Sequence, residues 1–289
     1  MDPKLRSFNI HHGNFQLRIL LLGISDLRIH EEVLEELEYK LMQDILTRNK
    51  LLDPIIVDAK TKVVLDGTHR LAALRKIGVK FIPSCLVDYS SSEVGVKRWI
   101  RGVKFGSEAS NISFLRDISV KLVKERIDEA IEAVNKGERD LAIVNANTAY
   151  ITHRRSKDAI ECSWVLRKVE KYFRENGARI NYLTMEDSLK LLLKGNIDLL
   201  LIYRPIRKKD VILAGKTGRL FAHKSTRHII SARPLGVDAP LSLLSGDYSE
   251  VNEKFVKFLS QRKLITLGEN IVVKDRRYEE YVYMFSGLE

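Results

Sequence analysis

The sequence predicts a protein of the α+β or α/β class that is built from two domains. Its 289 residues exceed what one compact domain usually holds and suffice for two, each with its own core. Residues 63–78 predict a short β-branched strand, a glycine turn and an apolar helix. Beyond residue 111, short apolar strands alternate with amphipathic helices, which is typical of an α/β domain.

The composition fits a globular protein, with 45% hydrophobic and 30% charged residues. The formal net charge of +11 suits an anionic partner, but it does not distinguish nucleic acid from a nucleotide or a phosphate metabolite. No apolar run approaches the ~20 residues of a membrane span, and the first residues do not resemble a secretory signal. Cys85 and Cys162 lack metal-ligand spacing, which predicts a reducing, cytoplasmic setting.

The first part of the chain predicts a sheet with covering helices. Residues 15–22 are expected to form a strand, and apolar residues at helical spacing over 33–49 predict a helix with one buried face. Ser90 and Glu93 have the spacing of a capping box, which predicts a further helix from Val94 to Gly102. The remaining elements expected here are a hairpin of 55–58 with 63–65, a helix over 68–77 and a strand over 81–87.

Residues 102–111 hold several glycines and serines and are the best candidate linker. This places the expected domains at residues 1–106 and 107–289. The elements expected in the second domain are helices at 120–134, 160–176, 187–194 and 252–262, strands at 140–144 and 197–203, and hairpins joining 211–214 to 219–222 and 264–265 to 270–273.

The most informative segment is the turn Asp66-Gly67-Thr68-His69-Arg70, between a predicted strand and a predicted helix. A helix N-terminus has unpaired backbone N–H groups and a partial positive charge, so it binds anions. Gly67 lets the backbone approach a phosphate closely, while Thr68, His69 and Arg70 add side-chain donors. The turn therefore predicts a phosphate-binding site.

Other polar groups are ambiguous when they are taken alone. Lys224-Ser225-Thr226-Arg227-His228 is a second dense cluster of hydroxyl, imidazole and guanidinium groups, but a polar loop of a basic protein would look the same. Glu31 and Glu32 lie where acids stabilise a helix start. Trp99 is, by residue type, most often a core residue.

Residues 53–82 resemble the shared core of the ParB/sulfiredoxin fold, a small sheet with a helix-capped phosphate-binding turn. Within that superfamily the chain resembles the free L-serine kinases of archaea. The positions that carry this resemblance are His30-Glu31, the turn at 66–70, Trp99, the cluster at 224–228 and Arg233-Pro234. Because the turn and the later cluster occur together, the resemblance is far more specific than the turn alone.

Two departures separate the chain from other branches of this superfamily. Sulfiredoxins carry a catalytic cysteine where this chain has Thr68, and Cys85 lies on a predicted strand away from the turn, which disfavours sulfiredoxin chemistry. ParB proteins follow the core with a helix-turn-helix domain, whereas residues 112–289 alternate strands and helices. A nucleotide-dependent, DNA-binding protein of the ParB type remains the main alternative and would account for the basic charge.

The resemblance implies a kinase that transfers the terminal phosphate of ADP or ATP to the hydroxyl of free L-serine, giving O-phospho-L-serine. Its site would lie in the cleft between the two domains. The implied residues are Glu31 as catalytic base with Glu32 as the alternative, Gly67, Thr68, His69, Arg70 and Lys224 at the nucleotide phosphates, and Trp99, Thr226, Arg227 and His228 at the serine.

Asp66 is an acid beside a phosphate site, where it would repel the ligand unless a cation lies between them. This predicts that Asp66 helps to position Mg²⁺, directly or through water, because Mg²⁺ in proteins usually keeps several waters.

Several properties stay open at this level. The sequence does not choose between ADP and ATP, between serine and a close analogue such as threonine or homoserine, or between oligomeric states. A membrane and nucleic acid are not expected as partners. O-phosphoserine would feed cysteine biosynthesis, and residues 245–289 have no expected role beyond packing.

Overall fold

The computed structural model of the protein describes residues 6–106, 120–273 and 276–287. The chain divides into two compact units, and both mix helices with strands, as predicted. Unit 1 comprises Met1–Gly95, Gly215–Gly218 and His228–Glu289, and unit 2 comprises Val96–Ala214 and Arg219–Arg227. Unit 2 is thus inserted within the sequence of unit 1, whereas the sequence predicted two consecutive domains that meet at residues 106 and 107.

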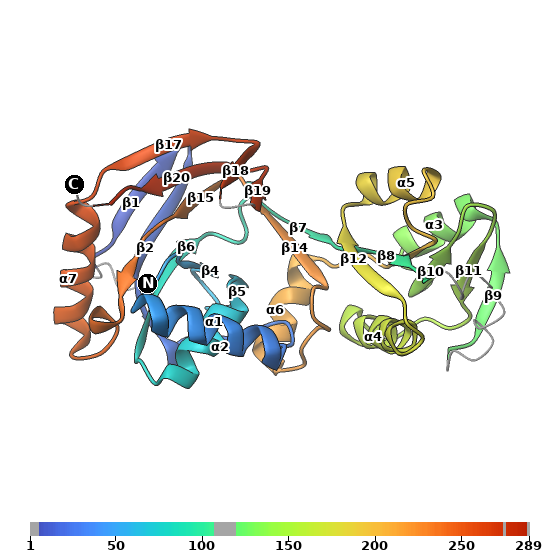
Figure 1. Cartoon of the computed structure of the whole chain (residues 1–289), viewed down its shortest axis with the longest axis horizontal. Coiled ribbons are helices and arrows are strands. Elements are labelled where there is room, and N and C mark those ends of the chain that lie inside the picture. The colour runs from blue at the N-terminus through green and yellow to red at the C-terminus, as the bar shows by residue number, and fades with distance from the viewer. Residues whose placement is uncertain (1–5, 107–119, 274–275, 288–289) are drawn as a thin grey trace. The chain divides into compact units, whose positions relative to one another are not determined.

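The centre of unit 1 is a five-stranded sheet with two helices beside it (Figure 1). The strands β4 and β6 are parallel, with Ile56 opposite Cys85, and the other neighbours are antiparallel. The strand order is β1 (Phe8–His12), β2 (Phe15–Gly23), β6 (Phe81–Val87), β4 (Ile55–Asp58) and β5 (Val64–Asp66). This arrangement confirms the strands and the hairpin predicted for residues 15–87.

The helices α1 (Glu35–Arg48) and α2 (Thr68–Ile77) pack against each other in unit 1 (Figure 1). The inward face of α1 is formed by Ile45 and by Glu38, whose carboxylate pairs with Lys76 of α2 at 2.9 Å. The prediction that the apolar residues of this helix form one buried face is wrong, because Glu38 shares the inward face with Ile45. Leu34, Leu37 and Leu46 are exposed instead.

The C-terminal part of the chain completes unit 1. The strands β15 (Ala232–Leu235), β20 (Tyr281–Phe285) and β17 (Leu264–Gly268) form a sheet in that order. Helix α7 (Tyr248–Ser260) is fixed to β2 through Asn252, whose Oδ1 accepts a hydrogen bond from the Leu21 amide at 2.9 Å. The predicted hairpin of 264–265 with 270–273 is wrong, because the apolar β20 is the partner of β17, while β18 (Ile271–Val273) pairs with β19 (Arg276–Tyr278).

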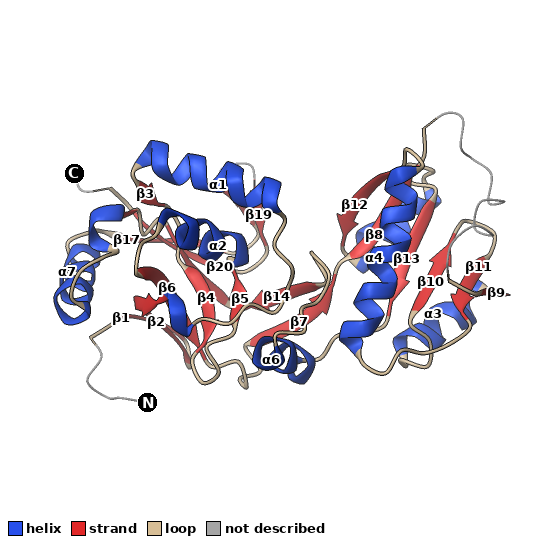
Figure 2. Ribbon diagram, turned by 90° about the horizontal axis from the view of Figure 1, so that it is seen from below, coloured by secondary structure: helices blue, strands red, loops and turns tan. Residues whose placement is uncertain are grey.

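Unit 2 is built on a six-stranded antiparallel sheet (Figure 2). Helix α4 (Ala159–Glu175) covers one face, and α3 (Ile127–Asn135) and α5 (Met185–Leu193) share a core with the other face. Residues 120–134 were expected to be one helix, but α3 begins only at Ile127, after a strand. The strand order is β12 (Arg179–Leu183), β8 (Ile100–Lys104), β13 (Leu199–Tyr203), β10 (Leu141–Val144), β11 (Ala149–Thr152) and β9 (Leu122–Glu125).

The chain enters unit 2 along β7 (Val94–Arg98) and returns along β14 (Thr226–Ile230), and these two strands pair. The helix predicted from Val94 to Gly102 is therefore wrong. Val94 and Val96 are β-branched and alternate with Gly95 and Lys97, a period of two that favours a strand over the helix that the capping-box spacing suggested. Residues 102–104 of the expected linker belong to β8, and residues 107–111 lie outside the described part.

Residues 211–214 were expected to form a hairpin with 219–222, but they lie in helix α6 (Lys208–Thr217). Val211 and Ala214 are both buried one helical turn apart, which a helix explains as well as an apolar strand does. A side chain at Gly215 would place its Cβ 2.6 Å from Cγ2 of Val63, so only glycine allows this approach. Among the described residues, no helix combines the length and the apolar run that crossing a membrane requires.

Candidate functional site

The predicted phosphate turn joins β5 to α2 in unit 1. Gly67 connects them with φ = +97°, and a Cβ at this position would lie 2.5 Å from Cγ2 of Ile55. Both facts require glycine. Helix α2 begins at Thr68, and no side chain caps its N-terminus, so the first N–H groups are left without an intrahelical partner. This end of α2 has the features of an anion site, and phosphate binding there stays a prediction.

Asp66, the acid beside the turn, is held by two arginines. Its Oδ2 accepts a hydrogen bond from Nη2 of Arg70 at 2.9 Å and another from Nη1 of Arg233. Burial alone would raise the pKa of the Asp66 carboxyl, but the charges of Arg233 and Arg70 outweigh it and hold the pKa well below its usual range. Asp66 is therefore ionised, and its counter-charges come from the protein.

Arg233 extends this network into the C-terminal part of the chain. Its guanidinium is buried, and its Nε donates to Oε1 of Glu280 at 2.6 Å while Nη1 donates to Asp66. Burial would lower the pKa of Arg233, but the two carboxylates outweigh it and raise the pKa. Glu280 stands just before β20, in the segment for which only packing was expected, and it supports the turn through Arg233.

Arg70 was expected to bind phosphate, but three of its hydrogen bonds go to unit 1 itself. Its Nη1 donates to the carbonyl oxygens of Pro54 at 2.6 Å and of Asp53 at 3.2 Å, in addition to the bond from Nη2 to Asp66. These bonds tie the start of α2 to the segment before β4. Arg70 thus fixes the shape of the turn.

Glu31 lies four residues before α1, and its side chain is 14% exposed. It is placed by its neighbour His30, which is buried and donates from Nδ1 to the Val64 carbonyl of β5 at 2.7 Å. The other ring nitrogen of His30 lies 3.8 Å from Oε1 of Glu31. Burial lowers the pKa of His30, more than the nearby Glu31 raises it, so the ring is neutral at pH 7. Glu32, the alternative base, is half-buried beside it.

His228 and His69 also lie near this segment of unit 1. The ring of His228 packs edge-on against His30 with centroids 5.3 Å apart, bonds to the Leu65 backbone and lies 2.9 Å from the Tyr89 hydroxyl. Burial, followed by the neighbouring His30, holds the pKa of His228 well below its usual value, so this ring supplies no positive charge for a substrate carboxylate. His69 accepts a hydrogen bond at Nε2 from the Leu34 amide at 3.3 Å.

The other predicted serine-binding residues form a group in unit 2. Nζ of Lys224 lies 5.6 Å and Cζ of Arg227 5.2 Å from the centre of the Trp99 ring, distances typical of cation–π contacts. Thr226 between them is buried. Lys224 has φ = +58°, in the left-handed region that non-glycine residues seldom adopt, so this backbone is held in place by its surroundings.

Arg101 is the residue that holds this backbone, and the sequence analysis missed it. It is fully buried in unit 2, pairs with Glu170, and donates to the carbonyl oxygens of Lys224 at 2.9 Å and His223 at 3.0 Å. Its signal in the sequence is an arginine between the apolar Ile100 and Val103, which a buried strand tolerates only if the charge is paired. The resemblance rests in part on Arg233 but implies no role for it, and the sequence gives no signal for Glu280.

The structure also bears on the two alternative functions considered from the sequence. Burial raises the pKa of the Cys85 thiol to about 12 on the inner strand β6, so it is no nucleophile near the turn. Among the described residues, unit 2 is a sheet covered by helices and offers no helix-turn-helix pair. In the same part of the chain, no group of three or more His, Cys, Asp or Glu residues could hold a metal ion.

Comparison with known proteins finds L-serine kinases of archaea and, over a shorter stretch, a ParB-like protein of Sulfolobus acidocaldarius, which is 35% identical over 104 residues that cover 36% of this chain and 50% of that relative. The chain is 25% identical over 231 residues to the ATP-dependent L-serine kinase of Staphylothermus marinus, covering 78% of this chain and 90% of that relative. It is 29% identical over 192 residues to the ADP-dependent L-serine kinase of Thermococcus kodakarensis, covering 63% and 73%. The chain resembles the archaeal L-serine kinases.

The fold agrees with this resemblance. A solved free serine kinase in complex with AMP matches with a TM-score of 0.68 and 21% identity, over 84% of this chain and 98% of that one. At this level of identity the likeness shows the fold, and the site residues rest on the geometry given above. No protein-family model matches the sequence.

Proposed function

We propose that this chain is a kinase that transfers the terminal phosphate of ADP or ATP to the hydroxyl of free L-serine. The observation that carries the proposal is the uncapped start of α2 behind Gly67, next to an acid that two arginines neutralise. This is a phosphate site in which the nearby carboxylate does not repel the ligand. The two relatives named above are serine kinases that differ in their nucleotide.

Phosphoryl transfer is achieved mainly by positioning and by stabilising charge on the phosphate oxygens. The backbone N–H groups of Thr68 and His69, with the Thr68 hydroxyl, would bind the transferred phosphate. Each such donor typically contributes ~10²–10³ in rate. Glu31 would accept the proton from the serine hydroxyl as that oxygen attacks the phosphorus. His30 would fix the backbone next to Glu31, because its own ring is bonded to β5.

The serine zwitterion needs a fixed positive charge for its carboxylate and a wall for its small side chain. We assign the charge to Arg227, with Lys224 in support of the same carboxylate or of the phosphates, and the wall to Trp99. The cation–π contacts of both basic residues with the Trp99 ring keep the three side chains together in unit 2.

The role expected for Asp66 in positioning Mg²⁺, directly or through water, stays a prediction. Oδ2 of Asp66 accepts hydrogen bonds from both Arg70 and Arg233, which supply the positive charge for which a metal was expected. No step of the mechanism is therefore derived through a metal. Asp66 acts here by holding the arginines that shape the turn.

The wider setting follows from the proposed reaction. We propose that the product, O-phosphoserine, feeds cysteine biosynthesis, because its phosphate group can leave as inorganic phosphate when sulfur replaces it at the β-carbon. We also propose a cytoplasmic location, consistent with two buried free cysteines. The ParB-type alternative is not favoured, since its helix-turn-helix domain has no counterpart in the described part of unit 2.

The test is a product assay with purified protein, Mg²⁺ and L-serine, with ADP and ATP in separate tubes and O-phosphoserine as the readout. Product from one tube establishes the kinase and identifies the donor. Threonine and homoserine serve as matched acceptors, since they keep the hydroxyl and the zwitterion. If no acceptor is phosphorylated with either donor, the proposal fails.

A further inference from the structure

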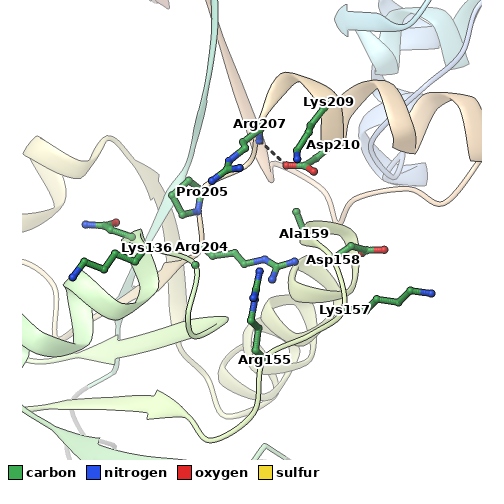
Figure 3. A pocket seen from close by; sticks show the side chains of 12 residues that line it. Lys136, Arg155, Lys157, Asp158, Ala159, Arg204, Pro205, Arg207, Lys209 and Asp210 are labelled. Carbon is green, nitrogen blue, oxygen red and sulfur yellow. Dashed lines mark hydrogen bonds between the residues drawn. The ribbon is translucent and has the colours of Figure 1, made fainter.

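Unit 2 contains a small basic cavity that the proposed reaction does not use. Its volume is about 230 Å³, and it is enclosed by the end of α3, the segment before α4 and the segment that leads into α6 (Figure 3). Half of the twelve residues around it are cationic, and two are acidic. The basic residues that line it are Lys136, Arg155, Lys157, Arg204, Arg207 and Lys209.

Four of these cations have no ion pair with any residue that the structure describes: Arg155, Lys157, Arg207 and Lys209. The two acids of the lining are already engaged. Asp158 accepts from the amides of Ile160 and Glu161 at the start of α4 and pairs with Arg219 at 2.7 Å. Asp210 accepts from the Arg207 amide at 2.9 Å (Figure 3).

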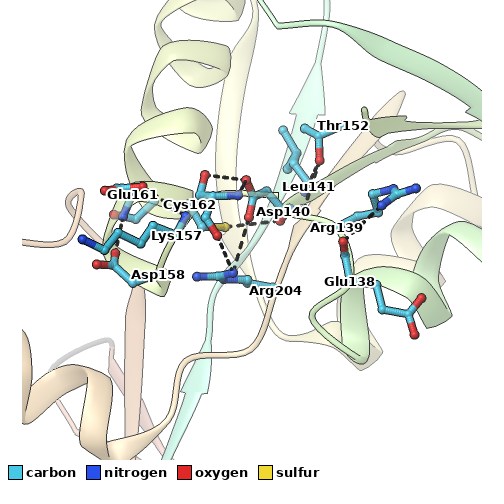
Figure 4. Close-up of polar contacts among 12 residues, drawn as sticks. Glu138, Arg139, Asp140, Leu141, Thr152, Lys157, Asp158, Glu161, Cys162 and Arg204 are labelled. Atoms are coloured by element: carbon cyan, nitrogen blue, oxygen red, sulfur yellow. Dashed lines mark hydrogen bonds and ion pairs between the residues drawn. The ribbon is translucent and has the colours of Figure 1, made fainter. Parts of the chain in front are cut away.

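The cavity also has a buried, fixed arginine. Arg204 is 6% exposed, and its Nη1 lies 3.3 Å from the Ser156 carbonyl oxygen and 3.7 Å from Oδ1 of Asp140. Asp140 in turn accepts from the Ser156 amide at 2.6 Å, so Arg204 and the segment before α4 are held by the same carboxylate (Figure 4). Arg204 is thus pre-organised, while the four unpaired cations surround it.

Like charges that converge on one cavity repel each other, and this repulsion is relieved when an anion binds among them. The start of α4 does not serve as the anion site, because Asp158 occupies its amides. The cations must therefore provide the binding energy. A volume near 230 Å³ lies below the ~300 Å³ from which drug-sized ligand sites begin, which favours a small anion over a whole nucleotide.

We propose that this cavity binds the phosphate group of inorganic phosphate or of a small phosphomonoester. Arg204 and Arg207 provide guanidinium forks from the wall that leads into α6, and Arg155 and Lys157 provide charge from the segment before α4. The site is independent of the phosphate turn, since every lining residue belongs to unit 2 and the turn belongs to unit 1.

The test compares the full-length wild-type chain with two double variants of equal charge. Arg155→Gln/Arg207→Gln removes two exposed cations of the cavity. Lys171→Gln/Lys190→Gln removes two exposed cations of unit 2 outside it, which pair with Glu175 and Glu186. Inorganic phosphate and β-glycerophosphate are titrated separately by calorimetry, and hydrogen–deuterium exchange locates the binding. Circular dichroism checks that both variants are folded.

The expected result is slower exchange at residues 153–160 and 204–211 on addition of phosphate, with affinity roughly tenfold or more lower in the cavity variant and unchanged in the control. If both anions slow exchange at these residues, the cavity accepts phosphomonoesters as well as phosphate. If phosphate alone slows it, the ligand is the inorganic ion. The proposal is overturned if neither anion slows exchange there, if protection appears only at residues 66–71, or if both double variants lose affinity equally.

Discussion

Replacing Asp66 by asparagine removes the charge that holds Arg70 and Arg233 while keeping the shape of the side chain. The carboxylate accepts hydrogen bonds from both guanidinium groups, and Arg233 is buried. An asparagine would leave both arginines facing a neutral amide. Breaking a buried ion pair by removing one partner typically costs ~3–5 kcal/mol, because a buried charge is left uncompensated.

The lower end of that range applies here. After the substitution Glu280 still pairs with Arg233, and the Pro54 carbonyl still accepts from Arg70. We therefore expect the free energy of unfolding of unit 1 to fall by about 3 kcal/mol at pH 7, with a lower midpoint of thermal unfolding by about 6–12 °C. Asp44→Asn is the matched control, since that exposed carboxylate pairs with Arg48 on its own helix and its loss should cost under ~0.5 kcal/mol.

The effect should also depend on pH in a defined direction. The folded pKa of Asp66 is lowered, so its stabilising contribution is fully present above the unfolded value of about 3.9 and is lost as the pH falls below it. The difference between wild type and Asp66→Asn should therefore shrink between about pH 5 and pH 2. Both tryptophans, Trp99 and Trp164, belong to unit 2, so unit 1 is followed by circular dichroism and by hydrogen exchange of β5 and α2.

The reasoning is refuted if Asp66→Asn costs less than about 1 kcal/mol at pH 7, or if the difference from wild type is the same at pH 2.

Three further predictions concern the site. Glu31→Gln should lower kcat by roughly 10²–10⁴ while ADP binding is retained, because the variant cannot accept a proton, and Glu32→Gln should keep most of the activity. Gly67→Ala should weaken ADP binding and destabilise unit 1 by about 1–3 kcal/mol, because its Cβ meets Ile55 and alanine disfavours the positive φ. Trp99→Leu should raise KM for serine while the Kd for ADP stays unchanged, since the indole is assigned to the serine pocket.

Each of these three predictions can be contradicted by a specific result. If Glu31→Gln turns over at the wild-type rate, Glu31 has no part in the mechanism. If Glu32→Gln is inactive and Glu31→Gln is active, Glu32 is the catalytic base. A Gly67→Ala protein that binds ADP like wild type shows that close backbone approach is not needed. If the KM for serine of Trp99→Leu, measured with saturating nucleotide, is unchanged, the Trp99 indole does not contribute to serine binding.

The local part of the site was predictable from the sequence, because its structure depends on neighbouring residues. A β-branched run, a glycine that must adopt positive φ and an apolar helix at residues 63–78 fix the turn by short-range interactions, and the structure confirms all three. The position of Glu31 just before the first helix is also local. These are the features for which periodicity and turn chemistry give direct evidence.

The remainder depends on contacts between distant residues. Nothing near Asp66 in the sequence indicates that Arg233 and Glu280 complete its surroundings, because those contacts form only when β15 and β20 pair side by side. Residues 211–214 were assigned to a strand because a short apolar run fits a helix and a strand equally well, and residues 94–102 to a helix because the capping-box spacing outweighed the alternation of Val94 and Val96. In the fold, β7 pairs with β14 and Gly215 of α6 lies against Val63, contacts that no local pattern indicates.

The insertion of unit 2 between β7 and β14 has a consequence for synthesis on the ribosome. Domains usually fold in the order in which they are made, N-terminal first. Here β2 and the phosphate turn emerge early, but α7, Arg233 and Glu280 are translated only after the whole of unit 2. Unit 2 therefore completes its core first. Until α7 is translated, the apolar strand β2 lacks the helix that packs on it. The nascent chain is most prone to aggregation in that interval.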